Sequence, residues 1–132
     1  IQITGKFTVQ NQEEAAYWIA SVHFLRTVTK MFFGTGENLG NPPPICILNG
    51  YGDFVYNNVP CVIKNFTVTM PNNVDYIAST TGSAGSSVTY VPTASDISVT
   101  VQPVYSRTQV KSFDLNAFAK GQLLDDNGLG WV

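Results

Sequence analysis

The sequence has little charge and no clustered basic residues, and both shortages narrow the classes of function. Only 12% of its 132 residues are charged, about half the share of an ordinary soluble domain. The hydrophobic fraction of 44% places the chain outside the composition of disordered proteins. We infer that a partner, or further copies of the chain, cover part of its surface in the working state. The net charge of −2, without a basic stripe, argues against a protein that grips a nucleic-acid backbone.

Cysteine and histidine are also scarce. Cys46 and Cys61 lie in separate apolar runs without CxxC spacing, and two buried thiols are favoured over a disulfide because free cysteine is among the most buried residue types. The single histidine, His23, has no carboxylate or cysteine three or four residues away that could complete a metal site or an acid–base pair. We therefore expect neither a metal nor a cofactor.

Motifs of enzymes and of membrane proteins are absent as well. The sequence has no GxSxG elbow, P-loop, zinc spacing or dinucleotide fingerprint. It has no apolar run of the roughly 18 residues that a membrane span needs, and no signal-peptide pattern. The chain starts at Ile1 without a methionine, which predicts a processed chain or a portion of a longer protein. We expect a protein that is not an enzyme and that has no membrane partner.

The first third of the chain predicts a strand followed by one long helix. Residues 1–9 alternate apolar and polar side chains, as a half-buried strand does. Asn11 and Glu14 have the spacing of a capping box and Gly34 is a stop signal, so the helix is expected at about 12–33. Its apolar positions cover an arc of about 200°, wider than the stripe of an ordinary surface helix. These positions are Ala15, Tyr17, Trp18, Val22, Phe24, Leu25, Val28, Met31 and Phe32.

Two arrangements of this helix account for the wide arc. In one, the helix lies across a sheet with its other side in water. In the other, it is covered twice, by its own sheet and by a neighbouring subunit.

Short strand-like segments fill the middle of the chain, at 45–48, 61–70, 87–91 and 96–105. Pro103 cannot donate to a ladder, so the last strand ends there or lies at a sheet edge. No helices alternate with these strands. The sequence therefore predicts one domain over 1–132 with a mainly β (α+β) fold, an antiparallel β-sandwich or barrel flanked by the helix.

Two further segments are candidates for contacts outside the core. Residues 79–87, "STTGSAGSS", predict a flexible loop at the tip of a hairpin between strands near Ile77 and Val88. This loop is either dispensable surface or a segment that becomes ordered against another subunit. The C-terminal arm, 113–132, is too apolar to be free in solvent, so it should dock on its own domain or on another chain.

The stretch "NGYGDFVYNNVP", residues 49–60, predicts a hairpin with a connection of three to eight residues, in which Asn49, Gly50 and Gly52 tolerate positive φ. Turn chemistry does not require its aromatic residues, Tyr51, Phe54 and Tyr56. They could stack a sugar, pack beneath the helix, or face a neighbouring protein. A third hypothesis, an enzyme that cleaves glycans, would need paired carboxylates across a cleft. Asp53 and Asp75 are its candidates.

Five successive segments are informative together: "NQEEAAYWIASVHFLRTVTKMFFG", "PPPICILNGYGDFVYNNVPCVIKNFTVTMP", "DYI", "YVPTASDISVTVQPVYSR" and "FAKG". They extend over most of the chain, from about residue 7 to residue 121, and resemble baseplate proteins of contractile-tailed bacteriophages that cap the baseplate and initiate the tail tube. The resemblance implies the tail-tube fold, a β-sandwich or barrel flanked by a helix. It also implies a structural protein without enzymatic activity.

The same resemblance implies a hexameric ring around a lumen that DNA crosses without specific binding. Its neighbours would be baseplate hub and tail-tube proteins, with assembly in the host cytoplasm and a final place in the virion. Strands of adjacent subunits in such rings commonly join into one inner β-barrel, and loops reach the next ring. The residues that we expect at subunit interfaces are Phe24, Tyr51, Phe54, Tyr56, Ser83 and Gly85. The alternative is a β-sandwich that binds carbohydrate or a receptor at a phage tail.

Overall fold

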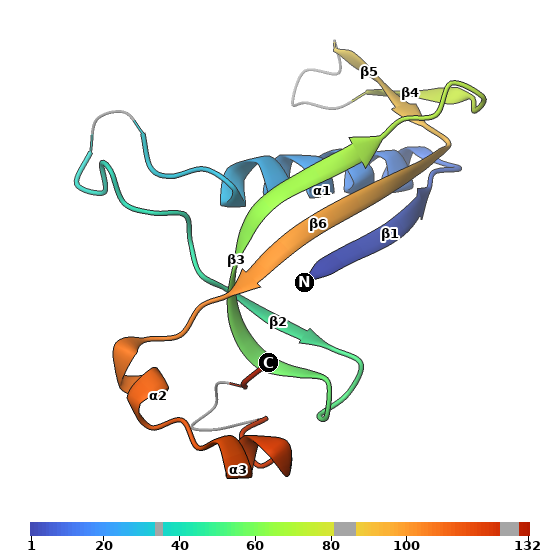
Figure 1. Cartoon of the computed structure of the whole chain (residues 1–132). Coiled ribbons are helices and arrows are strands. Elements are labelled where there is room, and N and C mark those ends of the chain that lie inside the picture. The colour runs from blue at the N-terminus through green and yellow to red at the C-terminus, as the bar shows by residue number, and fades with distance from the viewer. Residues whose placement is uncertain (34–35, 81–86, 125–129) are drawn as a thin grey trace.

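A four-stranded antiparallel sheet forms the centre of the computed structural model, which describes residues 1–33, 36–80, 87–124 and 130–132. The order of its strands is β1-β6-β3-β2, and a separate two-stranded sheet pairs β4 with β5 (Figure 1). The strands are β1 (Gln2–Thr8), β2 (Cys46–Gly50), β3 (Tyr56–Thr69), β4 (Tyr76–Thr80), β5 (Val88–Pro92) and β6 (Ala94–Pro103). The expected antiparallel, mainly β class with one long helix is confirmed. Of the two outcomes expected for Pro103, the structure shows the first, because β6 ends there.

The long helix, α1 (Gln12–Val28), begins at the predicted cap. The Asn11 side chain accepts a hydrogen bond from the Glu14 N–H at 2.9 Å, which satisfies one of the free amides of the first turn. The reciprocal half of the capping box is displaced by one residue, because the Glu14 carboxylate accepts from the N–H of Gln10 at 2.7 Å. The cap therefore joins the helix start to the end of the preceding segment.

The helix is shorter than the sequence predicts, since it ends at Val28 and not near residue 33. The helix ends in the run Thr27 and Val28, followed by Thr29 as its C-cap, and the branched side chains of these three residues lower helix propensity. The hydroxyls of Thr27 and Thr29 donate to the carbonyls of His23 and Leu25, both at 2.9 Å, a local competition that weakens helices. Met31 and Phe32 consequently belong to the connector that follows, and the expected stop signal lies outside the described residues.

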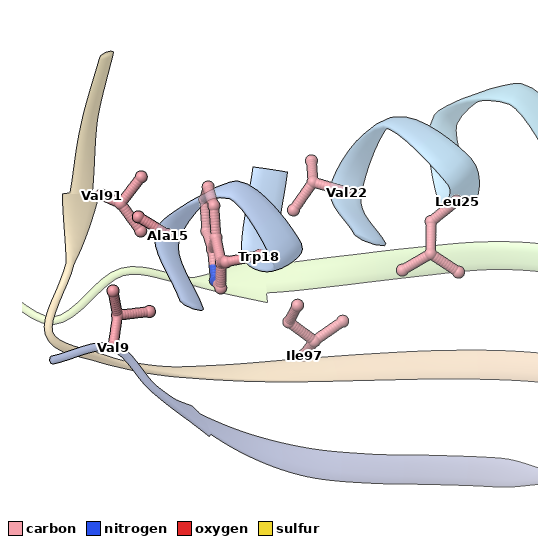
Figure 2. Close-up of a cluster of buried hydrophobic side chains, with 7 residues drawn as sticks. All are labelled: Val9, Ala15, Trp18, Val22, Leu25, Val91 and Ile97. Carbon is pink, nitrogen blue, oxygen red and sulfur yellow. The ribbon is translucent and has the colours of Figure 1, made fainter. Parts of the chain in front are cut away.

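One face of α1 packs on the sheet and forms the hydrophobic core (Figure 2). The buried helix positions are those at the centre of the predicted apolar arc, and Trp18 is the largest of them. Its indole N–H donates to the hydroxyl of Ser95 on β6 at 2.9 Å, so the one polar atom of this side chain is satisfied inside the core. The core cluster consists of Val9, Ala15, Trp18, Val22, Leu25, Val91 and Ile97.

The opposite face of the sheet is polar. In the antiparallel register Thr4 lies opposite Ser98 and Thr67 also pairs with Ser98, so these side chains share one face. Thr4 and Thr67 are exposed and Ser98 is half-buried, and Thr4 and Ser98 share a hydroxyl–hydroxyl hydrogen bond. The charged pair on this face is Lys6 and Asp96, which are cross-strand partners.

The predicted hairpin of the Ser/Thr/Gly-rich region is confirmed, with β4 paired to β5 in the register Thr80 to Val88. It lies by the N-terminal half of α1, where the Gln12 amide donates to the Thr80 hydroxyl at 2.9 Å (Figure 1). The tip of the hairpin, with the candidate residues Ser83 and Gly85, lies outside the described residues.

Two short helices that the sequence analysis did not predict follow β6: α2 (Arg107–Lys111), which precedes the C-terminal arm, and α3 (Leu115–Ala119), which lies in it. Both have recognisable caps, because Ser106 forms a full capping box with Gln109, and Asp114 caps α3.

The end of this arm docks on its own domain. Trp131 stacks on Tyr105 with ring centroids 4.1 Å apart, and the N–H of Gly130 donates to the carbonyl of Asn58 at 3.0 Å. A Cβ on Gly130 would collide with the carbonyl oxygen of Asn57, so only glycine allows this close approach. The arm thereby covers the beginning of β3.

Replacing Trp18 with alanine should lower the free energy of unfolding by about 3–5 kcal/mol, because it leaves a cavity between α1 and β6. Trp18→Phe keeps most of the apolar volume but loses the hydrogen bond to Ser95, so its loss should be smaller. Urea denaturation followed by circular dichroism measures both. A Trp18→Ala variant as stable as the wild type would contradict this account of the core.

The docking of the arm should weaken at alkaline pH. The Tyr105 hydroxyl donates to the Gly130 carbonyl at 3.2 Å and accepts from the Val132 N–H at 3.0 Å. Burial raises the pKa of Tyr105 above its ordinary value of 10.0, the hydrogen bond from Val132 lowers it, and Cys61 raises it. A raised pKa stabilises the fold at pH values below the ordinary pKa, and this contribution is lost as the pH rises through the folded value.

We therefore expect the wild type to lose more stability than Tyr105→Phe as the pH rises above the ordinary tyrosine pKa of 10.0. At neutral pH the variant itself should be less stable by about 1 kcal/mol, because both hydrogen bonds of the hydroxyl are missing. Urea denaturation across this pH range measures the difference, and the other titrating groups are common to both proteins. Parallel pH profiles would show that the Tyr105 hydroxyl does not couple the arm to the domain.

Candidate assembly surface

An apolar groove of about 500 Å³ runs between α1 and the β1 side of the sheet. Tyr17 and Phe24 form its helix wall although they are 68% and 58% exposed, and Phe7 stacks on Tyr17 with ring centroids 6.5 Å apart. Exposed aromatic side chains around a groove are typical of an interaction surface, and they are not typical of an ordinary solvent-exposed helix face. The main lining residues are Ile3, Phe7, Tyr17, Ala20, Phe24 and Val99.

The strand beside this groove is an edge of the sheet. β1 pairs with β6 on one side, and no strand among the described residues pairs with its other side. Such an edge presents N–H and C=O groups that can accept a further strand. β2 forms the opposite edge of the same sheet. Within the described part of the chain, each of these two edge strands pairs on one side only, and β1 adjoins the apolar groove.

A second aromatic surface is the tip of the β2–β3 hairpin. Tyr51 and Phe54 are 81% and 85% exposed, whereas Tyr56 is half-buried and lies edge-on to Tyr51 with centroids 6.3 Å apart. The hairpin tip lies at the far end of the sheet from α1 (Figure 1). Of the places considered for these aromatic residues, a position beneath the helix is therefore excluded.

The hairpin turn differs from the expected one. Asn49 and Gly50 belong to β2, and the connection comprises residues 51–55, within the expected length. Positive φ occurs at Tyr51 (61°), Gly52 (83°) and Asn58 (50°). The left-handed conformation costs a bulky residue such as Tyr51 about 1–2 kcal/mol, so this exposed aromatic side chain is held in place at an energetic cost. Backbone strain of this kind is typical of functional positions.

The other sequence candidates are dispersed. Asp53 lies in the β2–β3 connection and Asp75 precedes β4, so the length of β3 separates them (Figure 1). They do not form the paired carboxylates of a glycosidase. His23 is exposed on α1. Within the described ranges there is no group of three or more His, Cys, Asp and Glu that could hold a metal ion, and no described helix is long and apolar enough to cross a membrane.

Both cysteines are free thiols. Cys61 is buried, but Cys46 is only half-buried, which corrects the expectation of two buried thiols. Burial raises the pKa of the Cys61 thiol, and the neighbouring Cys46 raises it further. These residues are cross-strand partners in β2 and β3.

The sequence identified the helix wall of the groove but not its sheet wall. Phe24 and Tyr17 lie on the flank of the predicted arc, whereas Ile3 and Val99 meet only because β1 pairs with β6, more than ninety residues along the chain. The alternating pattern of residues 1–9 predicted which side chains of β1 face the core, but no local sequence signal predicts that β6 is the neighbouring strand.

Comparisons with protein-family models, with curated proteins and with solved structures found no match to this chain.

A charge at Phe24 should test the groove. Phe24→Asp places a carboxylate on its rim, where an apolar partner surface would have to desolvate it. Because Phe24 is 58% exposed, the free energy of unfolding should change by less than about 1 kcal/mol, while self-association is strongly reduced. Light scattering over a concentration series measures the association.

The matched control is Ala16→Asp, which adds the same charge at an exposed position of the same helix and should leave association unchanged. Equal association by Phe24→Asp and Ala16→Asp would exclude the groove as an interface. If Phe24→Asp instead unfolds the domain, the two-sided coverage of α1 is wrong.

Proposed function

We propose that this chain is a structural virion protein of a contractile phage tail. It forms a ring at the junction of baseplate and tail tube, and this ring initiates or caps the tube. The sequence resemblance implies that the ring is hexameric. The observation that carries the proposal is the combination of an open edge strand, β1, with an exposed apolar groove beside it. A domain with 12% charged residues that leaves this surface uncovered needs a partner for it.

The two open edges of the sheet support a ring over a two-fold dimer. A contact between the β1 edge of one copy and the β2 edge of the next is heterologous, and heterologous contacts close into rings when the rotation allows. Strand addition at such edges gains main-chain hydrogen bonds, and neighbouring pockets give specificity. Phe24 and Tyr17 in the groove, with Tyr51, Phe54 and Tyr56 at the opposite end of the sheet, are then the side chains at the contacts between copies.

The polar face of the sheet is the surface that we assign to the lumen. Its exposed hydroxyl side chains, including Thr4, Thr67 and Thr69, carry no charge, and the Lys6–Asp96 pair on this face is balanced. A face of this kind offers DNA no cationic grip. DNA passing through the ring would therefore meet a wetted, nearly neutral wall. The remaining partners in this proposal are baseplate hub and tail-tube proteins, and the place of the protein is the virion after assembly in the host cytoplasm.

A carbohydrate- or receptor-binding module of a phage tail is the second candidate. The observation in its favour is the exposure of Tyr51 and Phe54 next to Asp53 at the hairpin tip, because aromatic faces near polar groups can stack sugars. The edge-on arrangement of Tyr51 and Tyr56 gives these two rings no common plane on which a sugar could lie. We therefore favour assembly.

Electron microscopy of the purified chain should distinguish the two functions. We expect rings with a central hole, or stacks of such rings, at high protein concentration, and their loss in Phe24→Asp but not in Ala16→Asp. Discrete monomers at every concentration, together with a glycan-array signal that Tyr51→Ala and Phe54→Ala abolish, would contradict the assembly function and favour the second candidate.

A further inference from the structure

The two cysteines of the chain face each other across the β2–β3 ladder. Cys46 on β2 pairs directly with Cys61 on β3 in the antiparallel register, so both side chains lie on the same face of the sheet. They are the only cysteines in the sequence, and both are free. Two facing thiols that are not bonded to each other form a site for oxidation within one chain.

The backbone spacing at this position suits a disulfide. Directly opposed residues of an antiparallel pair have Cα atoms about 4.5 or 5.5 Å apart, depending on the hydrogen-bonding of the pair. Disulfides bridge Cα atoms about 4.4–6.8 Å apart. Both possibilities lie in that range, so the bond requires only small adjustments of the side chains and not a rearrangement of the strands.

The two thiols differ in access. Cys46 is half-buried and can meet a reagent from solution, whereas Cys61 is 2% exposed. Desolvation raises the pKa of Cys61, and Cys46 adds to the increase, so burial disfavours the nucleophilic thiolate form of Cys61. Because Cys46 is the more accessible thiol, we expect Cys46 to react first and Cys61 to react second.

We propose that Cys46 and Cys61 form a reversible cross-strand disulfide when the chain meets a small-molecule disulfide such as oxidised glutathione, and that the bond clamps β2 to β3. The inference does not depend on the proposed function, because it rests on the register of one ladder and on the exposure of two thiols.

The reaction is a double thiol–disulfide exchange. The Cys46 thiolate attacks one sulfur of oxidised glutathione, which forms a mixed disulfide and releases one glutathione. The Cys61 thiol then loses its proton, and its thiolate attacks the Cys46 sulfur, which breaks the mixed disulfide and releases the second glutathione. The chain loses two hydrogens and is oxidised, and glutathione disulfide is reduced to two thiols.

The disulfide would act on the shorter of the two edge strands of the sheet. β2 has five residues, and among the described residues it pairs with β3 alone. Short edge strands open locally more readily than central ones. The bond closes a loop that contains Tyr51 and Phe54, so oxidation would fix the base of the hairpin that presents these exposed aromatic residues.

Oxidation of the full chain with glutathione disulfide tests the proposal. At low protein concentration we expect both free thiols to disappear, a mass decrease of two hydrogens with no glutathione retained, and a monomeric band on a non-reducing gel. Dithiothreitol should reverse all three. Hydrogen exchange of the β2 amides should slow at least several-fold in the oxidised chain, since a cross-link opposes local opening.

Two single variants separate the roles of the thiols. In Cys61→Ser, the mixed disulfide at Cys46 should persist because the resolving thiol is missing. In Cys46→Ser, Cys61 should react much more slowly than Cys46 does. A wild type that keeps both thiols, retains one glutathione like Cys61→Ser, or cross-links only between chains would overturn the proposal. Unchanged β2 exchange in the oxidised chain would overturn the clamp.

Discussion

The packing of Trp18 between α1 and β6 is the contact on which the other features of this domain depend. Its indole lies in the core, and its N–H is bonded to Ser95, so the helix is held at one position over one face of the sheet. The position of α1 determines which surfaces of the sheet and of the helix remain uncovered. The polar face of the sheet lies away from the helix, and Tyr17 and Phe24 remain largely exposed on the helix flank.

These uncovered surfaces offer a physical explanation for the low charge of the sequence. A monomer in water would ordinarily place charged residues around an open sheet edge, because unpaired strands recruit other chains. Here the β1 edge adjoins an apolar groove. The sheet also ends in a second open edge at β2. The proposed self-assembly, through strand pairing and aromatic contacts, would account for the low charge, the apolar groove and the two sheet edges together.

The β2–β3 end of the molecule differs from the α1 end in what stabilises it. The hydrophobic core lies under α1. The β2–β3 hairpin depends instead on the ladder between its two strands and on the docked C-terminal arm, whose Trp131 stacks on Tyr105. Tyr51 is nevertheless held in a left-handed conformation there. A strained, exposed tip on a weakly held edge strand is a place where a covalent link between Cys46 and Cys61 would have the largest effect on local opening.

Caps, periodicity and proline act within a few residues. For this reason the sequence alone predicted the class of the fold, the cap of α1 at Asn11 and its buried positions from Ala15 to Val28, and it marked Pro103 as a strand end or an edge position. It placed the end of α1 five residues too late, since apolar spacing continued past the Thr-rich turn that terminates the helix. No sequence pattern predicted that Cys46 faces Cys61, that Phe7 meets Tyr17 or that Gly130 packs on Asn57. Such contacts join segments distant in sequence, and their register is set by the packing of the whole domain and not by local propensity.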